Sequence, residues 1–138
     1  MRIWIAASVA LVALAGCGGA HRHPPSAPPV QAWRSVCGRF AQHDVQLRSL
    51  VWTSRLHPYV PAQARTAVTR VRADLVTLKP YLTHDERIGL GRYLTGVDSV
   101  EIGFDAYLAG DVRGATKDLD DAMGDLDASR LSSLCAVG

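Results

Sequence analysis

The stretch from Pro61 to Leu82, PAQARTAVTRVRADLVTLKPYL, decides the fold. Its apolar residues recur in alternating steps of four and three, which is the spacing of one face of an α-helix. Pro61 suits the first turn of a helix, where its missing N–H costs little, and Pro80 should end the helix near Leu78 or kink it. The stretch therefore predicts an amphipathic helix with one buried face. That face consists of Ala64, Val68, Val71, Leu75, Leu78 and Leu82.

A longer helix is predicted before this one, from Gln31 to about Arg55. Its apolar stripe has a gap at the middle that is filled by His43 and Asp44, so we expect at least one of these side chains to be partly buried. The segment 57–61, HPYVP, predicts a turn, because a residue that precedes proline avoids the α region. The apolar stripe of this first helix consists of Trp33, Val36, Cys37, Phe40, Leu47, Leu50 and Val51.

Two further helices are predicted after Leu82. Thr83 and Glu86 have the spacing of a capping box, which begins a third helix that runs to about Ala109. Gly110 and Asp111 indicate a helix end followed by an N-cap, so a fourth helix follows, and Ser132 to Gly138 form a short tail. The third stripe is Leu90, Leu94, Val97, Phe104 and Leu108, with Glu101 inside it, and the fourth is Val112, Ala115, Leu119, Ala122, Met123 and Leu126.

Long helices joined by short turns predict an all-α fold, an antiparallel up-down four-helix bundle over residues 31–138. In that topology the start of the first helix and the end of the fourth lie at the same end of the bundle. Cys37 and Cys135 stand at those two places. About 120 residues remain after a short leader, which is enough for one domain with a single core.

Four glycines recur every seven residues along the third helix and its end: Gly89, Gly96, Gly103 and Gly110. Each interior glycine weakens a helix by about 0.5–1 kcal/mol relative to alanine. One interpretation is that a neighbouring helix approaches closely along this line. The other is that Gly110 is only a C-terminal cap and that the spacing is partly chance.

The amino terminus carries one cation, Arg2, an apolar run from Ile3 to Leu14, and then Ala15-Gly16-Cys17. The run is too short for a spanning helix, which needs about 20 apolar residues, and suits a secretory signal. Leu14-Ala15-Gly16-Cys17 resembles the lipobox of bacterial lipoprotein precursors. The resemblance implies that residues 1–16 are a signal peptide, that Cys17 carries diacylglycerol and an acylated amino terminus, and that the chain is held at the extracytoplasmic face of the cell membrane. An ordinary cleaved signal and an uncleaved anchor are the alternatives.

Residues 17–30 then read as the lipidated cysteine and a flexible Pro-rich linker, with prolines at positions 24, 25, 28 and 29. If Cys17 takes lipid, Cys37 and Cys135 remain as an even pair in an oxidising compartment, which predicts a disulfide. Two buried free thiols are the alternative. Neither cysteine has a second Cys or His at ligand spacing, which disfavours a metal site.

Charge is divided between the two halves of the domain. Residues 34–79 contain eight cations and two acids, and residues 83–130 contain five cations and eleven acids. The halves could pair with each other at the rim of the bundle, or present two oppositely charged outer faces to a lipid or a partner. The net charge of +2 does not indicate nucleic acid, and export makes such a partner unexpected.

Motifs for catalysis or metal binding do not emerge from the residue spacing, so we expect neither an enzyme nor a bound cofactor. The acidic run from Asp118 to Asp127 lacks the oxygen ligands of an EF-hand at Ala122 and Met123. His43, Asp44 and Glu101 could form a buried polar cluster, either as a structural hydrogen-bond network or as a ligand site.

Two functional hypotheses follow. The first is a non-enzymatic lipoprotein that binds a partner protein or an envelope component. The second is a carrier for an apolar ligand or haem, with a pocket between helices. Haem could be ligated by His43, His57, His84, Tyr59 or Tyr81, although their spacing does not select it.

Overall fold

The computed structural model describes residues 30–54 and 61–136, and these residues are all-α, as predicted. The helices are α1 (Val30–Ser54), α2 (Pro61–Leu78), α3 (His84–Leu108), α4 (Val112–Ala128) and α5 (Leu131–Ala136), and a 3-10 turn, η1 (Lys79–Tyr81), follows α2. Within the described residues there is no strand. The predicted carboxy-terminal tail is partly helical, because α5 occupies most of it.

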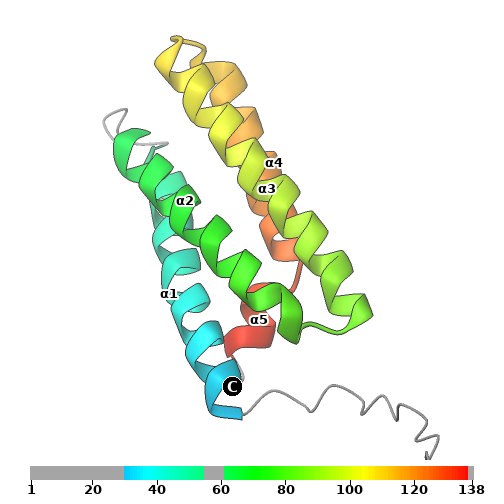
Figure 1. The fold of residues 1–138 in the computed structure, drawn as a ribbon. Helices are drawn as coiled ribbons and strands as arrows, with labels where there is room; N and C mark the ends of the chain where they lie inside the picture. Colours follow the sequence, from blue (N-terminus) through cyan, green and yellow to red (C-terminus); the bar gives the residue numbers. More distant parts are fainter. Residues whose placement is uncertain (1–29, 55–60, 137–138) are drawn as a thin grey trace, which may run out of the picture.

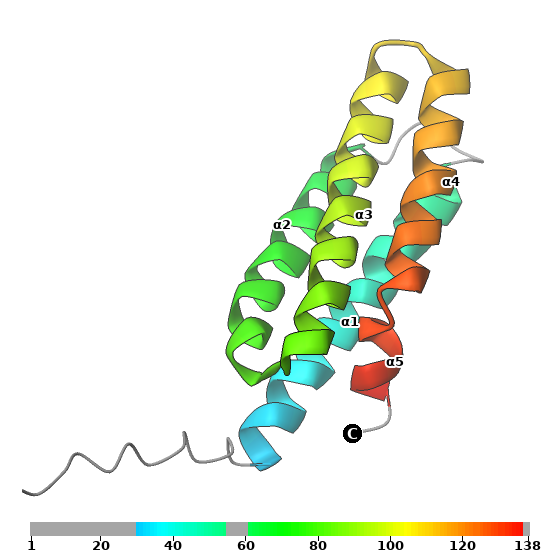
Figure 2. The ribbon, with the colours of Figure 1, turned by 90° about the vertical axis from the view of Figure 1, so that its right-hand side faces the viewer.

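The helices are arranged as two pairs (Figures 1 and 2). α1 lies beside α2, α3 lies beside α4, and the contact between α2 and α3 joins the pairs. The α3–α4 contact is the most extensive of the interhelical contacts. The short helix α5 lies against α1 and also touches α3 and α4. The last helix of the described chain is thus brought back to the first.

The helix ends follow local chemistry. The Glu86 N–H donates to Thr83 Oγ1 at 3.3 Å, and the Thr83 N–H donates to Glu86 Oε2 at 2.7 Å, so the predicted capping box is present. At the start of α4, the Gly114 N–H donates to Asp111 Oδ1 at 2.8 Å, which makes Asp111 the predicted N-cap. The helix α2 ends at Leu78, and Pro80 lies in the 3-10 turn, because proline cannot continue the helical hydrogen bonding.

The core is built from the predicted stripes. All six apolar residues of the α2 repeat are at most 4% exposed. Two predicted core positions are wrong: Leu108 is 58% exposed and Val112 is 53% exposed, because both lie beside the turn between α3 and α4. Two α3 residues outside the predicted stripe, Tyr93 and Val100, are instead fully buried.

Glycines in α3 allow α4 to pack closely against it. A Cβ added to Gly103 would lie 2.8 Å from Leu119 Cγ, and one added to Gly96 would lie 3.0 Å from a carbonyl oxygen of α4. A Cβ on Gly89 would lie 2.4 Å from the carbonyl oxygen of the residue that follows α4. Gly110 has no such neighbour but has a φ of +85°, which favours glycine. Both interpretations of the glycine spacing therefore hold, for different members of the set.

Candidate functional site: the buried polar networks and the disulfide

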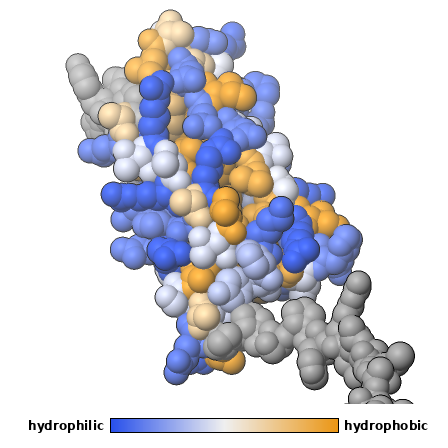
Figure 3. Space-filling model, in the orientation of Figure 1, coloured by the Kyte–Doolittle hydropathy of each residue, from blue (hydrophilic) through white to orange (hydrophobic). Residues whose placement is uncertain are grey.

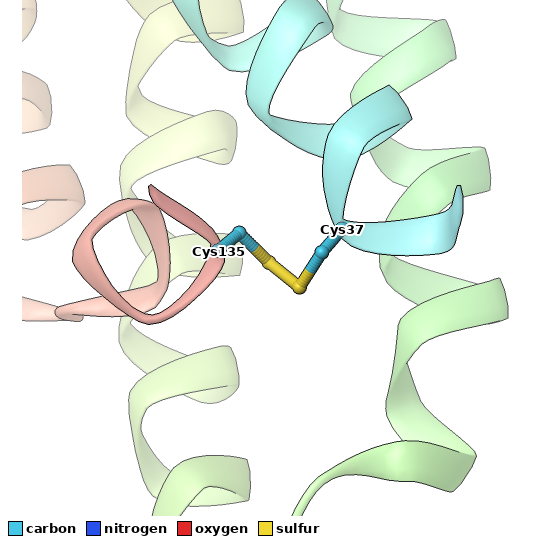
Figure 4. Close-up of a disulfide and its surroundings, with 2 residues drawn as sticks. All are labelled: Cys37 and Cys135. Carbon is cyan, nitrogen blue, oxygen red and sulfur yellow. A yellow bond between two sulfur atoms is a disulfide. The ribbon is translucent and has the colours of Figure 1, made fainter. Parts of the chain in front are cut away.

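The sulfur atoms of Cys37 on α1 and Cys135 on α5 lie at disulfide-bonding distance, 2.15 Å apart, with their Cα atoms 4.9 Å apart (Figure 4). The two residues are separated by 98 positions in the sequence, and both are buried. The pairing is the one that the sequence predicted. In the chain-entropy model, closing a loop of this length stabilises the folded state by about 4–5 kcal/mol. The bond fastens α5 to the first turns of α1.

Asp44 of α1 is a buried carboxylate, only 3% exposed. The Tyr93 hydroxyl of α3 donates a hydrogen bond to its Oδ1, and Arg48 Nε donates to the same oxygen at 2.9 Å. The Tyr93 ring packs edge-on against Phe40, with the ring centroids 5.2 Å apart. A buried charge is tolerated when it is paired and hydrogen-bonded, and Asp44 meets both conditions.

Arg48 connects this carboxylate to the carboxy-terminal helices. Its Nη1 donates to Asp127 of α4, and its Nη2 donates to Ser132 Oγ of α5 at 3.2 Å. Burial disfavours the charged guanidinium, but the hydrogen bonds to Asp127 and Asp44 outweigh that cost and raise the pKa of Arg48. One side chain thus joins α1 to both α4 and α5. This link adds to the disulfide, which joins α1 to α5 alone.

Burial, followed by the nearby Asp44 carboxylate, raises the pKa of the Tyr93 hydroxyl well above its usual range. Ionised Tyr93 would face a carboxylate in an apolar environment, so the neutral form is strongly favoured. Tyr93 therefore acts as a fixed hydrogen-bond donor to Asp44.

A second buried network centres on Asp74 of α2, which is 3% exposed. Arg39 Nε donates to Asp74 Oδ1 at 2.8 Å, and His43 Nδ1 lies 2.5 Å from Asp74 Oδ2. Sequence reasoning missed Asp74, although it lies three residues after Val71 and next to Leu75, on the buried face of the clearest amphipathic repeat. That position was the available signal for a buried carboxylate.

The three polar residues singled out from the sequence belong to separate networks. His43 contacts Asp74, Asp44 contacts Tyr93 and Arg48, and the carboxylate of Glu101 pairs with Arg72. The Glu101 side chain is 45% exposed and lies at the rim. The structure therefore does not bring the three together as one cluster.

Ion pairs between the basic and acidic halves run along the contact of α2 with α3. Arg65 pairs with Asp105 at 2.9 Å, and Arg72 pairs with both Asp98 and Glu101 at 2.5 Å. Burial opposes the charge of Arg72, but the hydrogen bonds to its two carboxylates raise its pKa. Each exposed pair contributes only about 0–1 kcal/mol, so these contacts help to align the helices more than they hold them together. These ion pairs support the interpretation that the basic and acidic halves of the domain pair with each other.

Surface hollows are open to solvent. One, of about 580 Å³, lies between α1 and α2 and is lined by Val45, Leu50, Ala67 and Arg70 among others. Another, of about 550 Å³, lies between the start of α3 and the α4–α5 connection. On the face drawn in Figure 3, hydrophobic residues are scattered among hydrophilic ones.

Several predicted features have no assigned geometry, because Cys17, the leader, His57 and Tyr59 lie outside the described residues. His84 is exposed at the start of α3, and Tyr81 packs against Trp33. No three His, Cys, Asp or Glu side chains in ranges 30–54 and 61–136 are grouped to hold a metal ion. None of the described helices has the length and apolar character that spanning a membrane requires.

Comparison with protein-family models, with curated proteins and with solved structures finds no match to this chain.

Proposed function

We propose that the chain is a lipid-anchored extracytoplasmic lipoprotein whose helical domain binds a partner protein or an envelope component and catalyses no reaction. The observation that carries the proposal is the sequence Leu14-Ala15-Gly16-Cys17 directly after an apolar run. The Cys37–Cys135 pair supports it, because disulfides persist in oxidising compartments outside the cytoplasm.

We also infer that α1 to α4 form an antiparallel up-down arrangement, which α5 and the disulfide close. The short connections support this topology, since only residues 79–83 separate α2 from α3 and residues 109–111 separate α3 from α4. The side-by-side pairs in Figures 1 and 2 are compatible with it. In such an arrangement the lipid tether and the carboxy-terminal helix lie at the same end of the domain.

The polar chemistry favours a structural or binding module over an enzyme. The buried carboxylates Asp44 and Asp74 are both engaged by arginine and by a second donor, which is the pattern of groups that hold a fold together. The shape of the surface favours a binding module over a small-ligand carrier, because a carrier buries most of its ligand in a pocket and these hollows are open.

The anchor is tested by intact-mass analysis of the full-length protein expressed in a bacterium and extracted from its membranes. We expect a chain that begins at Cys17 and carries diacylglycerol and an amide-linked acyl group. The Cys17→Ala variant should lack the adduct and leave the membrane fraction. A bare polypeptide from the unmodified sequence would refute the anchor.

The binding role is tested by cross-linking in intact cells, followed by purification of the lipidated protein. We expect a defined cross-linked partner that is lost or reduced for Cys17→Ala, because the tether places the domain at the membrane. Identical partners and an identical membrane fraction for both forms would contradict the proposal.

A further inference from the structure

An aromatic pair marks the end of the domain where α1 begins. Trp33 of α1 contacts Tyr81 of η1, with ring centroids 6.2 Å apart and planes at 46°. Both residues are half-buried, so part of each remains accessible to solvent. Val30, the first residue of α1, is 65% exposed. Trp and Tyr combine an apolar ring with a polar atom and are enriched where a membrane meets water.

Two exposed cations accompany this pair. Arg34 follows Trp33, and Lys79 lies two residues before Tyr81. The only acids in the described parts of α1, α2 and η1 are Asp44 and Asp74, and both are buried and bonded. Arg34 and Lys79 are therefore not balanced by an exposed acid of their own helix pair, whereas Arg65 and Arg72 of the same pair are neutralised by acids of α3. We call Val30, Trp33, Arg34, Lys79 and Tyr81 the foot surface.

The place of the foot surface in the chain relates it to the tether. α1 begins at Val30, thirteen residues after Cys17, and thirteen residues span at most about 45 Å. In Figure 1 the start of α1 lies at the lower end, whereas the α3–α4 turn lies at the upper end. A lipid on Cys17 would thus be joined to the described domain at the foot surface, where α1 begins. A short tether also raises the effective concentration of lipid at this surface, so weak contacts suffice.

We propose that the foot surface lies on anionic phospholipid headgroups, which fixes the orientation of the tethered domain. This inference rests on the proposed lipid anchor. Arg34 and Lys79 supply attraction to the headgroup phosphates, and the two rings and Val30 insert at headgroup level. Asp85 and Glu86 in the first turn of α3 are acidic and would be repelled by the same lipids, so they lie outside the foot surface.

The test uses the full-length lipidated protein in vesicles whose acyl chains are brominated, because bromine quenches tryptophan fluorescence at short range. The vesicles contain phosphatidylcholine alone or with phosphatidylglycerol. After removal of the signal, Trp33 and Trp52 are the remaining tryptophans. Trp52→Phe reports on Trp33, and Trp33→Phe reports on Trp52, which is 63% exposed and about 28 Å further along the same helix.

We expect quenching of Trp33 to be several-fold stronger than quenching of Trp52 in the anionic vesicles. High salt and the double substitution Arg34→Gln, Lys79→Gln should each reduce the Trp33 signal towards its level in phosphatidylcholine. Circular dichroism confirms that the variants are folded. Equal quenching of both tryptophans, or Trp33 quenching that salt and the double substitution leave unchanged, would overturn the inference.

Vesicle flotation separates this inference from the anchor on which it rests. Protein that fails to float with phosphatidylcholine vesicles lacks a functional anchor, which refutes the proposed function. Protein that floats with both vesicle types but shows no preferential Trp33 quenching has an anchor and lacks the lipid-facing foot surface.

Discussion

The Tyr93 hydroxyl of α3 donates a hydrogen bond to the buried Asp44 carboxylate of α1. This contact joins one helix of each pair through the interior of the domain. Since Arg48 extends it to α4 and α5, four helices share one polar network. Substitutions in this network therefore test how the two helix pairs are held together.

Replacing Tyr93 with phenylalanine should destabilise the domain by about 1–3 kcal/mol, because the buried Asp44 carboxylate loses a donor. Urea denaturation of the protein measures the change. Tyr107→Phe is the matched control, because Tyr107 is half-buried and packs against the core at the other end of α3. Equal effects of the two substitutions would show that the Tyr93 hydroxyl contributes no special stability.

Stability should fall as the pH rises above about 10, where tyrosine ionises in the unfolded chain. The raised pKa of Tyr93 keeps it neutral in the folded protein, so its contribution is complete below that pH and is lost progressively above it. Denaturation curves at a series of alkaline pH values measure the slope. The Tyr93→Phe variant should show a shallower slope, and an unchanged slope would contradict this assignment.

Replacing Arg48 with glutamine should cost about 3–5 kcal/mol, since it leaves Asp44 buried without its cation. It also removes the link to Ser132, so amide hydrogen exchange in α5 should accelerate. Arg65→Gln provides the control, because the Arg65–Asp105 pair is exposed and should be worth about 0–1 kcal/mol. Similar losses for both variants would argue against the network.

Substituting both Cys37 and Cys135 with alanine should lower the free energy of unfolding by about 4–5 kcal/mol on the chain-entropy estimate. The loss should be largest in α5, which would keep only its noncovalent contacts with α1. Thermal denaturation of the oxidised protein, the reduced protein and the double variant measures the effect. A melting temperature that is the same in all three would rule out a stabilising disulfide.

Gly89→Ala and Gly91→Ala should have opposite effects, although both lie in the first half of α3. A methyl group at Gly89 would meet the Ser129 carbonyl oxygen at 2.4 Å and should destabilise the fold by about 1–3 kcal/mol. A methyl group at Gly91 meets nothing within 4 Å and should stabilise the helix by about 0.5–1 kcal/mol. Effects of the same sign in urea denaturation would mean that α4 does not limit the space at Gly89.

Helix periodicity predicted much of the fold because it depends on local spacing. All six residues of the predicted α2 repeat are buried, although Ala67 and Asp74 on the same helix are buried as well, and Thr83 and Asp111 located the starts of α3 and α4. The helix α5 was missed because six residues are too few for a repeat to emerge. The exposure of Leu108 at the end of α3 was not predicted either, since it depends on how far the neighbouring helices extend.

The polar networks were only partly predictable. The gap in the first stripe indicated that His43 or Asp44 would be buried, but their partners depend on interhelical packing. Tyr93 and Asp74 lie on other helices, 49 and 31 residues away from Asp44 and His43 respectively. Sequence spacing within one helix carries no information about such pairs.

The Cys37–Cys135 bond also determines how the domain would bear mechanical load. Force applied between Val30 and Ala136 would pass from the first turns of α1 across the two sulfur atoms into the end of α5. The intervening helices would be bypassed and would carry no tension. A domain with this bond can be pulled at its two ends without unfolding the helices between Cys37 and Cys135.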